Sequence, residues 1–273
     1  MNILIIGCGY VGTAVAKVWT EAGHNVTVTT TTPDRVPELE AVAQGVVILK
    51  GDDLNTMRDV LTDQQVVLLS VGAKNRQVYR QTYLKTAETL VAALKSTNTV
   101  EQLIYTGSYA VYGDQQGEWV SEDSPVAPAN ENGEILHQTE QVLLTAASPQ
   151  LTVCILRIAG IYGPGRTLLR IFQNLAGKTR PGTGQEIANW IHLDDIVGAL
   201  EFIRCQQLGG IYNLAHDLPV TTGELLDGLF ARHGLAKVIW DPSIPQVRPY
   251  NARLSNKKLK AAGFSLIHPE LEF

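Results

Sequence analysis

The sequence predicts an α/β fold in which a doubly wound parallel sheet is covered by helices on both faces. Short apolar, β-branched runs alternate with longer stretches of helical period, and the runs are apolar throughout rather than at every second residue. Strands of this kind are buried on both sides, as in a parallel sheet with crossover helices. A glycine-rich turn also follows the first run directly. These observations predict a Rossmann-type sheet with a smaller C-terminal domain.

The expected elements follow one another in regular order along the chain. The apolar runs predict strands over 2–7, 25–30, 45–51, 65–72, 101–108, 151–160 and 209–216. The amphipathic stretches predict helices over 12–23, 55–63, 79–97, 133–147 and 192–205. After Gly160 the pattern changes, because Gly/Pro turns interrupt the helices. We therefore expect a sheet domain over 1–162 and a smaller, interleaved region over 163–273, whose strand near 211–214 returns to the sheet.

Composition favours a folded globular protein and argues against nucleic-acid-binding and membrane proteins. A chain of 273 residues with 45% hydrophobic residues can bury a full core. The formal net charge of −5 and the absence of a basic run argue against a nucleic-acid partner. The three cysteines are far apart in the sequence, and we expect reduced packing residues. The apolar start is too short for a signal or a membrane span, so we expect a cytoplasmic protein without membrane contact.

The stretch NILIIGCGYVG carries the main functional signal. Gly7, Gly9 and Gly12 form a G-x-G-x-x-G pattern between a predicted strand and a predicted helix. The first glycine allows a tight turn, the second lets the backbone approach a pyrophosphate, and the third lets the helix pack on the strand. Amides at the helix start, including those of Tyr10 and Val11, then face the phosphates. We predict a dinucleotide-binding turn.

The end of the second strand bears on the choice of cofactor. NAD sites usually carry an acid here for the ribose hydroxyls, but this chain has Thr30, followed by Thr31 and Thr32. Hydroxyl groups do not repel a 2′-phosphate, and Arg35 could pair with one. We therefore favour NADP, with NAD as the other candidate. In the alternative interpretation the threonines are strand and turn formers and Arg35 is solvated.

Two further strand ends supply cofactor candidates. Asp52 or Asp53 could accept from the adenine amino group, although Asp53 could instead cap the next helix. Ser70, Val71 and Gly72 end the fourth strand with side chains small enough to let a ribose and a nicotinamide pass.

These motifs resemble those of the extended short-chain dehydrogenase/reductase family, of the NAD-dependent epimerase/dehydratase type. The resemblance rests on GCGYVG, GDDL, TGSYAVYGD, LRIAGIYGPG, WIHLDDIVGAL, YNLAHDLPVTTGEL and RPYNARLSNKKL, and runs along nearly the whole chain. It implies a Rossmann domain for the cofactor and a small C-terminal domain for the substrate, often a nucleotide sugar.

The resemblance also implies a catalytic Ser, Tyr and Lys. Ser108 matches the serine, and Tyr112 is the tyrosine of the VYG motif, which we place among the substrate contacts. The Tyr-x-x-x-Lys positions fall on Asn132 and Leu136 when Glu140 is matched to the family's glutamate. Neither residue can act as the proton donor of a reductase. The chain is therefore similar to the atypical subgroup that lacks this pair.

Three side chains are candidates to replace the missing acid. Tyr83 lies where the family's fourth helix often carries an Asn near the nicotinamide, and Tyr109 follows Ser108 directly. We take Tyr83 and Tyr109 as catalytic candidates, each with core packing as the alternative. His137 is adjacent to the lost lysine position but points about 100° away from it on a helix, so we rank it lower.

The second half contributes candidates for substrate binding. Arg166, Arg180 and Arg248 suit a phosphate or carboxylate through bidentate hydrogen bonds. In the family, the His and Asp of a motif such as His192-Leu-Asp194-Asp195 organise a loop and cap the next helix. No further ligands lie near them in the sequence, so we predict no metal site.

The sequence leaves three functions open. The first is an NAD(P)-dependent oxidoreductase or epimerase-like enzyme acting on a small carbonyl or sugar-like substrate. The second is a non-catalytic NADP(H) sensor or scaffold, and the third is a degenerate fold. The resemblance also implies a possible homodimer through 77–96 and 134–147. The apolar residues Ile135, Val142 and Leu143 permit it, but they could equally belong to the core.

Overall fold

The structure is a computed structural model that describes residues 1–244 and 250–272. The chain divides into two units of three segments each. Unit 1 consists of Met1–Ser108, Glu131–Arg157 and Val197–Tyr212, and unit 2 of Tyr109–Asn130, Ile158–Ile196 and Asn213–Phe273. We predicted a sheet domain over 1–162 followed by an interleaved region over 163–273, and in the structure the chain passes between the two units several times.

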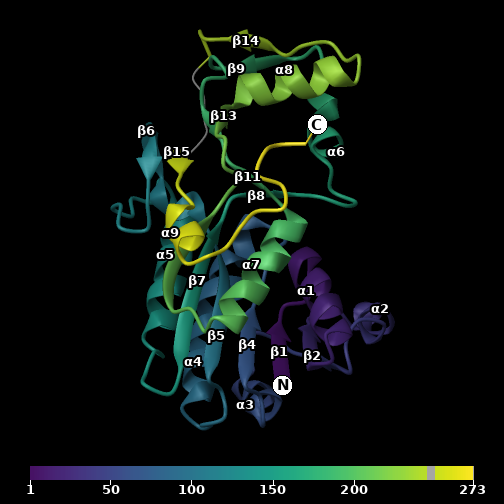
Figure 1. Ribbon diagram of the computed structural model, residues 1–273, viewed down its shortest axis with the longest axis vertical. Helices are drawn as coiled ribbons and strands as arrows, with labels where there is room; N and C mark the ends of the chain where they lie inside the picture. Colours follow the sequence, from purple (N-terminus) through teal and green to yellow (C-terminus); the bar gives the residue numbers. More distant parts are fainter. Residues whose placement is uncertain (245–249, 273) are drawn as a thin grey trace. The chain divides into compact units, whose positions relative to one another are not determined.

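Unit 1 is built on a seven-stranded sheet with the order β12-β7-β5-β4-β1-β2-β3 (Figure 1). Strand β1 pairs in parallel with β2 on one side and with β4 on the other. The strands are β1 (Asn2–Ile6), β2 (Asn25–Thr30), β3 (Gly45–Ile48), β4 (Val66–Leu69), β5 (Gln102–Ser108), β7 (Thr152–Ile158) and β12 (Gly210–Leu214). The predicted doubly wound parallel sheet is confirmed, and the strand order reverses between β1 and β4, where such folds bind ligands.

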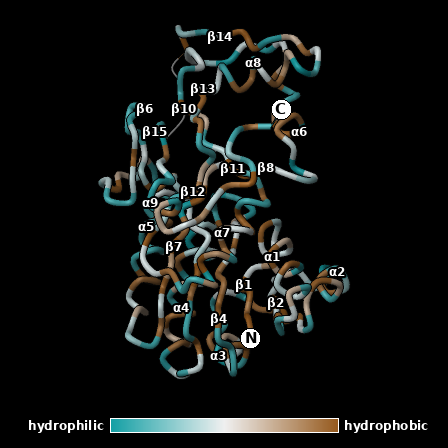
Figure 2. Tube along the Cα trace, viewed as in Figure 1, coloured by the Kyte–Doolittle hydropathy of each residue, from teal (hydrophilic) through white to brown (hydrophobic). Residues whose placement is uncertain are grey.

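Helices cover the sheet of unit 1 on both faces. They are α1 (Tyr10–Glu21), α2 (Val36–Glu40), α3 (Leu54–Leu61), α4 (Thr86–Leu94), α5 (Glu131–Leu144) and α7 (Leu193–Cys205), the last of which begins in unit 2. Leu4 and Leu69 share a core cluster with Met57, Leu90 and Leu143, from α3, α4 and α5. The brown traces of β1 and β4 in Figure 2 reflect their apolar sequences.

The other face of the sheet is held by α1 and α7. Trp19 of α1 is fully buried, and its Nε1 donates to Glu201 of α7 at 2.7 Å. Gln102 of β5 donates to the carbonyl oxygen of Ile203 at 2.9 Å. Because α1 follows β1 directly, this packing fixes the direction in which the first helix leaves the glycine turn.

The side chains proposed for a dimer face are used within the chain. Ile135 is 3% exposed and Leu143 is 0% exposed. Val142 is half-buried and packs against the same core cluster as Leu143. These placements favour the core interpretation of all three residues.

Unit 2 consists of short strands and short helices. Its strands are β6 (Asp114–Val120), β8 (Gly160–Tyr162), β9 (Thr179–Pro181), β10 (Ile187–Ala188), β11 (Trp190–His192), β13 (Val220–Thr221), β14 (Ile239–Asp241) and β15 (Asn251–Leu254). Its remaining helices are α6 (Leu168–Phe172), α8 (Thr222–Arg232) and α9 (Lys257–Ala261). The strands pair two by two, β10 with β13, β11 with β8, β14 with β9 and β15 with β6. Among the described residues, no helix has the length and apolar character needed to cross a bilayer.

Polar side chains join distant segments of unit 2. The buried Asn189 donates from Nδ2 to the carbonyl oxygen of Ala252 at 2.7 Å and accepts the amide of Leu254 at 3.0 Å. Asn251 accepts the amide of Ile187 at 3.0 Å. An apolar cluster that includes Phe230 supplies the core beside these bonds.

Candidate functional site

The glycine turn requires glycine at two positions for separate reasons. Gly7 has a φ of +88°, and a Cβ there would lie 2.7 Å from the carbonyl oxygen of Ser70. A Cβ on Gly12 would lie 2.6 Å from the carbonyl oxygen of Gly7. A side chain at either position would push the turn away from β4 or the helix away from the turn. The turn is therefore packed tightly against the end of β4 and against the start of α1.

Gly9 differs from its neighbours, because a Cβ at this position would meet nothing within 4 Å. It is the N-cap of α1, a helix without a side-chain cap and without an acidic residue in its first turn. Amides at such a helix start can bind phosphate oxygens. The open space over Gly9 therefore fits a pyrophosphate. Of the two predicted neighbours, Tyr10 is exposed while Val11 is 8% exposed, so the predicted contact of Val11 would involve its backbone.

Thr29 supports the turn and was not singled out from the sequence. Its hydroxyl accepts the amide of Gly7 at 3.1 Å, and its carbonyl oxygen accepts the amide of Cys8 at 3.0 Å. The threonine run drew attention to this strand end, but the sequence did not show which hydroxyl faces the turn. Burial raises the pKa of the Cys8 thiol, which agrees with a packing role for that residue.

The predicted 2′-phosphate contacts lie at the end of β2. Thr30 is 7% exposed, and its hydroxyl accepts the amide of Thr32 at 3.1 Å, whereas Thr31 is exposed. Arg35 donates from Nη1 to the carbonyl oxygen of Cys8, which brings its guanidinium to the glycine turn. The same group donates to both carboxylate oxygens of Glu38, at 3.2 and 2.8 Å, and this hydrogen bonding raises the pKa of Arg35.

The two aspartates after β3 have different surroundings. Asp53 is the N-cap of α3 and accepts the amide and the hydroxyl of Thr56, at 3.1 and 2.7 Å. The bonds to Thr56 lower the pKa of Asp53. This geometry favours the capping interpretation of Asp53. Asp52 is exposed beside it and keeps the adenine role as a prediction.

The carboxyl ends of β4 and β5 bring three hydroxyl-bearing residues into one region. The hydroxyl of Thr106 lies 3.2 Å from that of Ser70. Ser108 ends β5 and is half-buried. Val71 packs against the glycine turn, while Gly72 is exposed and open on its Cβ side.

Tyr83 belongs to a π-helical turn, Gln81–Lys85, just before α4. Turns of this type are frequent at functional sites. The Tyr83 hydroxyl accepts the amide of Ala73 at 3.4 Å, so its polar end lies at the loop that follows β4. Its ring packs on that of Tyr79 with a centroid distance of 4.8 Å. Tyr83 is half-buried and packs against the core cluster of unit 1, so core packing accounts for its ring and the catalytic role stays a prediction.

Helix α5 carries the positions matched to the family's Tyr and Lys. Asn132 is half-buried in its first turn, and Leu136 is 5% exposed. Further along the helix, Glu140 receives Arg157 of β7 in a buried bidentate ion pair, with Nη2 to Oε2 at 2.7 Å. His137 lies 4.0 Å from the same carboxylate. The helix is thus fastened to the sheet by this ion pair.

Two tyrosines of unit 2 are more buried than a contact role would favour. Tyr112 is 0% exposed, and its hydroxyl donates to Asn213 at 2.9 Å. This placement favours a packing role for Tyr112, and its role as a substrate contact stays a prediction. Tyr109 is 6% exposed and packs edge-on against Tyr250.

The two described arginines of the predicted anion-binding set have different surroundings. Arg166 is exposed and donates to the carbonyl oxygen of Ile161 at 3.0 Å. Arg180 lies on β9 and lines a cavity of about 490 Å³ with Phe172, Trp190 and Trp240. Among the described residues lining this cavity, Arg180 is the only charged one. Arg248 lies outside the described residues.

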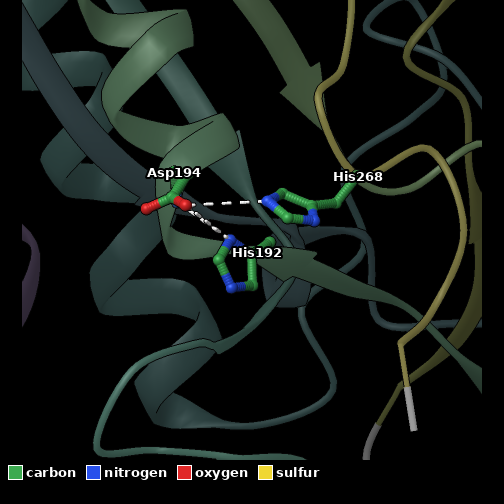
Figure 3. Close-up of side chains that lie close together, drawn as sticks. All are labelled: His192, Asp194 and His268. Carbon is green, nitrogen blue, oxygen red and sulfur yellow. Dashed lines mark hydrogen bonds and ion pairs between the residues drawn. The ribbon is translucent and has the colours of Figure 1, made fainter.

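His192 and Asp194 are joined by a residue that sequence analysis did not consider. His268 of the C-terminal segment packs against His192, with ring centroids 3.9 Å apart and the ring planes tilted by 43°, and both rings face the Asp194 carboxylate (Figure 3). Burial and the nearby His268 lower the pKa of His192. The buried Asp195 accepts the amides of Ile267 and His268, at 2.5 and 3.1 Å, and so fastens the C-terminal segment.

Comparison with known proteins identifies relatives along most of the chain. Residues 3–215 match the model of the NAD dependent epimerase/dehydratase family. Protein YeeZ of Escherichia coli (strain K12) is 32% identical over 222 residues, which cover 78% of this chain and 77% of that protein.

Solved structures share the fold. The structure of MoeE5 in complex with UDP-glucose and NAD superposes with a TM-score of 0.81 at 20% identity, covering 97% of this chain and 93% of that one. A dTDP-glucose 4,6-dehydratase from Bacillus anthracis in complex with NAD gives a TM-score of 0.82 at 18% identity, covering 98% and 92%.

Proposed function

The chain belongs to the NAD-dependent epimerase/dehydratase family, and from this premise we propose that it is an NAD(P)-dependent oxidoreductase or epimerase-like enzyme. Its substrate class is a nucleotide sugar or a related small carbonyl compound. The observation that carries the proposal is the open space over Gly9 at the uncapped start of α1. A turn that only linked a strand to a helix would not need this space.

The residues present fit a dinucleotide. The amides at the start of α1 bind the pyrophosphate, Asp52 accepts from the adenine, and Ser70 and Gly72 leave room for the ribose and nicotinamide. When bound, the nicotinamide accepts or gives a hydride. The chain's own residues orient that group and exchange the accompanying proton.

NADP is the preferred form in this proposal. Arg35 reaches the glycine turn, and Thr30 to Thr32 add no negative charge at the ribose end. A 2′-phosphate would take the place of the Glu38 carboxylate on the Arg35 guanidinium, since both present paired oxygens to it. Glu38 is exposed and can turn into solvent when displaced.

Ser108 and Tyr83 perform the chemistry on the substrate. Ser108 donates a hydrogen bond to the oxygen at the reacting carbon, which holds that oxygen and stabilises its developing charge. Tyr83 passes the proton, directly or through a water, since its hydroxyl lies at the loop after β4. We prefer Tyr83 to Tyr109 because Tyr109 is 6% exposed.

The cavity of unit 2 suggests how the nucleotide part of the substrate is held. Its walls contain Phe172, Trp190 and Trp240, which offer flat apolar surfaces to a base, and Arg180 offers a charge to a phosphate. MoeE5, which shares the fold, has been solved with UDP-glucose. We infer that a nucleotide diphosphate group is the part of the substrate that this unit recognises.

A second candidate is a dinucleotide-binding protein without catalysis. It is favoured by Asn132 and Leu136 on α5, where the family's acid and its neighbouring lysine would be expected. Such a protein would sense the oxidised and reduced cofactor or act as a scaffold. It shares the glycine turn with the enzyme and differs from it in the absence of turnover.

Titration of the purified protein with NADPH and with NADH tests the cofactor part. Trp19 on α1 makes intrinsic fluorescence a suitable signal. Gly9→Ala should keep the fold, since its Cβ meets no atom, but should weaken binding about tenfold or more by blocking the phosphates. Arg35→Ala should weaken NADPH alone, and Glu38→Gln should tighten it. Equal binding by wild type and Gly9→Ala would contradict the proposed site.

Turnover on a panel of nucleotide sugars and carbonyl compounds tests the catalytic part. Ser108→Ala and Tyr83→Phe should lower the rate by about 10²–10⁴-fold while leaving cofactor binding unchanged. Cofactor binding without turnover on any compound would favour the sensor. Equal rates in wild type and Tyr83→Phe would remove Tyr83 from the mechanism.

A further inference from the structure

We propose that His192, Asp194 and His268 form a binding site for a divalent transition-metal ion, with Zn²⁺ as the expected occupant. The three residues come from the end of β11, the first turn of α7 and the C-terminal segment. Their ligand atoms all lie within 4.8 Å of one another. The sequence did not suggest this site, because His268 is far from the other two ligands in the chain. It lies 73 residues beyond Asp195, the neighbour of Asp194.

The spacing of the donor atoms suits zinc. Asp194 Oδ2 lies 3.5 Å from Nδ1 of His192 and 3.6 Å from Nε2 of His268. Nitrogen and oxygen ligands bind zinc at about 2.0–2.2 Å, so neighbouring ligands of a tetrahedral ion lie about 3.4 Å apart. The observed distances match that edge closely, and both rings turn their nitrogens toward the carboxylate (Figure 3). Imidazole and carboxylate together are typical zinc ligands.

Hydrogen bonds orient both imidazoles toward the position of the ion. Nδ1 of His268 lies 2.7 Å from Glu272 Oε1, and a carboxylate only accepts, so Nδ1 carries a proton and the ion would bind at Nε2, which faces Asp194, in place of any proton there. A carboxylate behind a histidine is the usual support of a metal-bound imidazole. Nδ1 of His192 accepts the amide of Asp194 at 3.2 Å, so it carries a lone pair. When the ion binds, the lone pair on Nδ1 of His192 coordinates the metal, and the hydrogen bond from the Asp194 amide is given up.

Nε2 of His268 and Oδ2 of Asp194 lie 3.6 Å apart and form an ion pair when His268 is protonated, and a metal ion bound here would take the place of the proton on Nε2. An ion would tie the C-terminal segment to β11 and α7, in addition to the hydrogen bonds from its amides to Asp195. This site does not depend on the proposed dinucleotide chemistry.

The experiment uses untagged full-length protein treated with a chelator, dialysed against Zn²⁺ and analysed for bound metal. Co²⁺ is the spectroscopic probe, because its visible absorption reports nitrogen and oxygen ligands. We expect one ion per chain in wild type and at least tenfold weaker binding in His192→Ala and His268→Ala. His233→Ala is the matched control, because His233 is exposed at the end of α8. Glu272→Gln should weaken binding about 10–100-fold without removing a ligand.

Circular dichroism of each variant shows whether it is folded, and Asp194→Asn provides a third ligand change if one histidine variant is not. Less than one ion per chain in wild type would overturn the proposal and leave a protonated His268 between two carboxylates. Equal loss of binding in His233→Ala and His268→Ala would also overturn it, as would a Co²⁺ spectrum identical to that of the free ion.

Discussion

The two units hold themselves together in different ways. In unit 1, strands that are apolar throughout bury their side chains on both faces, and one buried ion pair fastens α5 to β7. In unit 2 the strands are short, and asparagine and aspartate side chains bond directly to the backbone of remote segments. Apolar burial tolerates small shifts because it has no direction, whereas each of these polar bonds specifies one partner. Unit 2 therefore relies more on directional polar bonds between its segments, and unit 1 more on apolar burial.

The largest expected effect is in unit 1, at its buried ion pair. Glu140→Gln leaves the Arg157 guanidinium buried without a counter-charge, since both side chains are 2% exposed. We expect the free energy of unfolding to fall by about 3–5 kcal/mol. Urea denaturation measures this, with the exposed Glu134→Gln on the same helix as control. A loss below about 1 kcal/mol would show that water reaches the Arg157 guanidinium and solvates it in the absence of the carboxylate.

Asn189 tests whether unit 2 depends on single polar residues. Asn189→Ala removes both buried bonds to β15 and leaves an amide and a carbonyl without those partners. We expect a loss of about 2–4 kcal/mol in the free energy of unfolding. The exposed Asn98→Ala is the control. A loss as small as that of the control would mean that unit 2, like unit 1, is held mainly by apolar burial.

Thr29→Val extends the comparison to unit 1, because it removes a single polar bond there. The change keeps the shape of a side chain that is 2% exposed and removes the acceptor of the Gly7 amide. We expect a loss of about 1–2 kcal/mol, together with weaker dinucleotide binding. Thr27→Val, two residues earlier on the same face of β2, is the control for both measurements. Unchanged binding in Thr29→Val would show that the turn needs no support from β2.

The smallest expected effect is the cap of α8 in unit 2. Backbone and side-chain hydrogen bonds from Thr221 lower the pKa of Glu224. A lowered folded pKa means that Glu224 stabilises the fold above its unfolded pKa of about 4.3, and that this stability is lost as the pH falls through the folded value. Glu224→Ala should cost under about 1 kcal/mol at pH 7, because the group is exposed, and nothing near pH 2. Urea unfolding at both pH values checks this, and an equal cost at both would contradict it.

The same contrast explains what could be predicted from the sequence. Each of the seven expected strands overlaps a strand of the main sheet, because a continuous apolar run is a local signal. Strand β6 (Asp114–Val120) could not be found in this way. Its sequence, DQQGEWV, is polar, and it becomes a strand only by pairing with β15, which is far away in the chain.

The candidate site, too, has features that could be predicted from the sequence and features that could not. The glycine pattern pointed to the turn because Gly7 and Gly12 each have a local steric reason to be glycine. The support from Thr29, the capping role of Asp53 and the meeting of His268 with His192 depend on where side chains point after folding. Residue types alone do not encode those directions.

The repeated passage of the chain between the two units has a consequence for how the protein can be cut and how it folds. A fragment ending at residue 162 would lack both β12 and the part of α7 that belongs to unit 1. Strand β7 would then become an edge strand with unpaired backbone groups, which invites aggregation. During synthesis the sheet of unit 1 likewise has to wait for residues 197–212 before it can close. Folding of unit 1 should therefore be slow for its size, since contacts far apart in sequence form late.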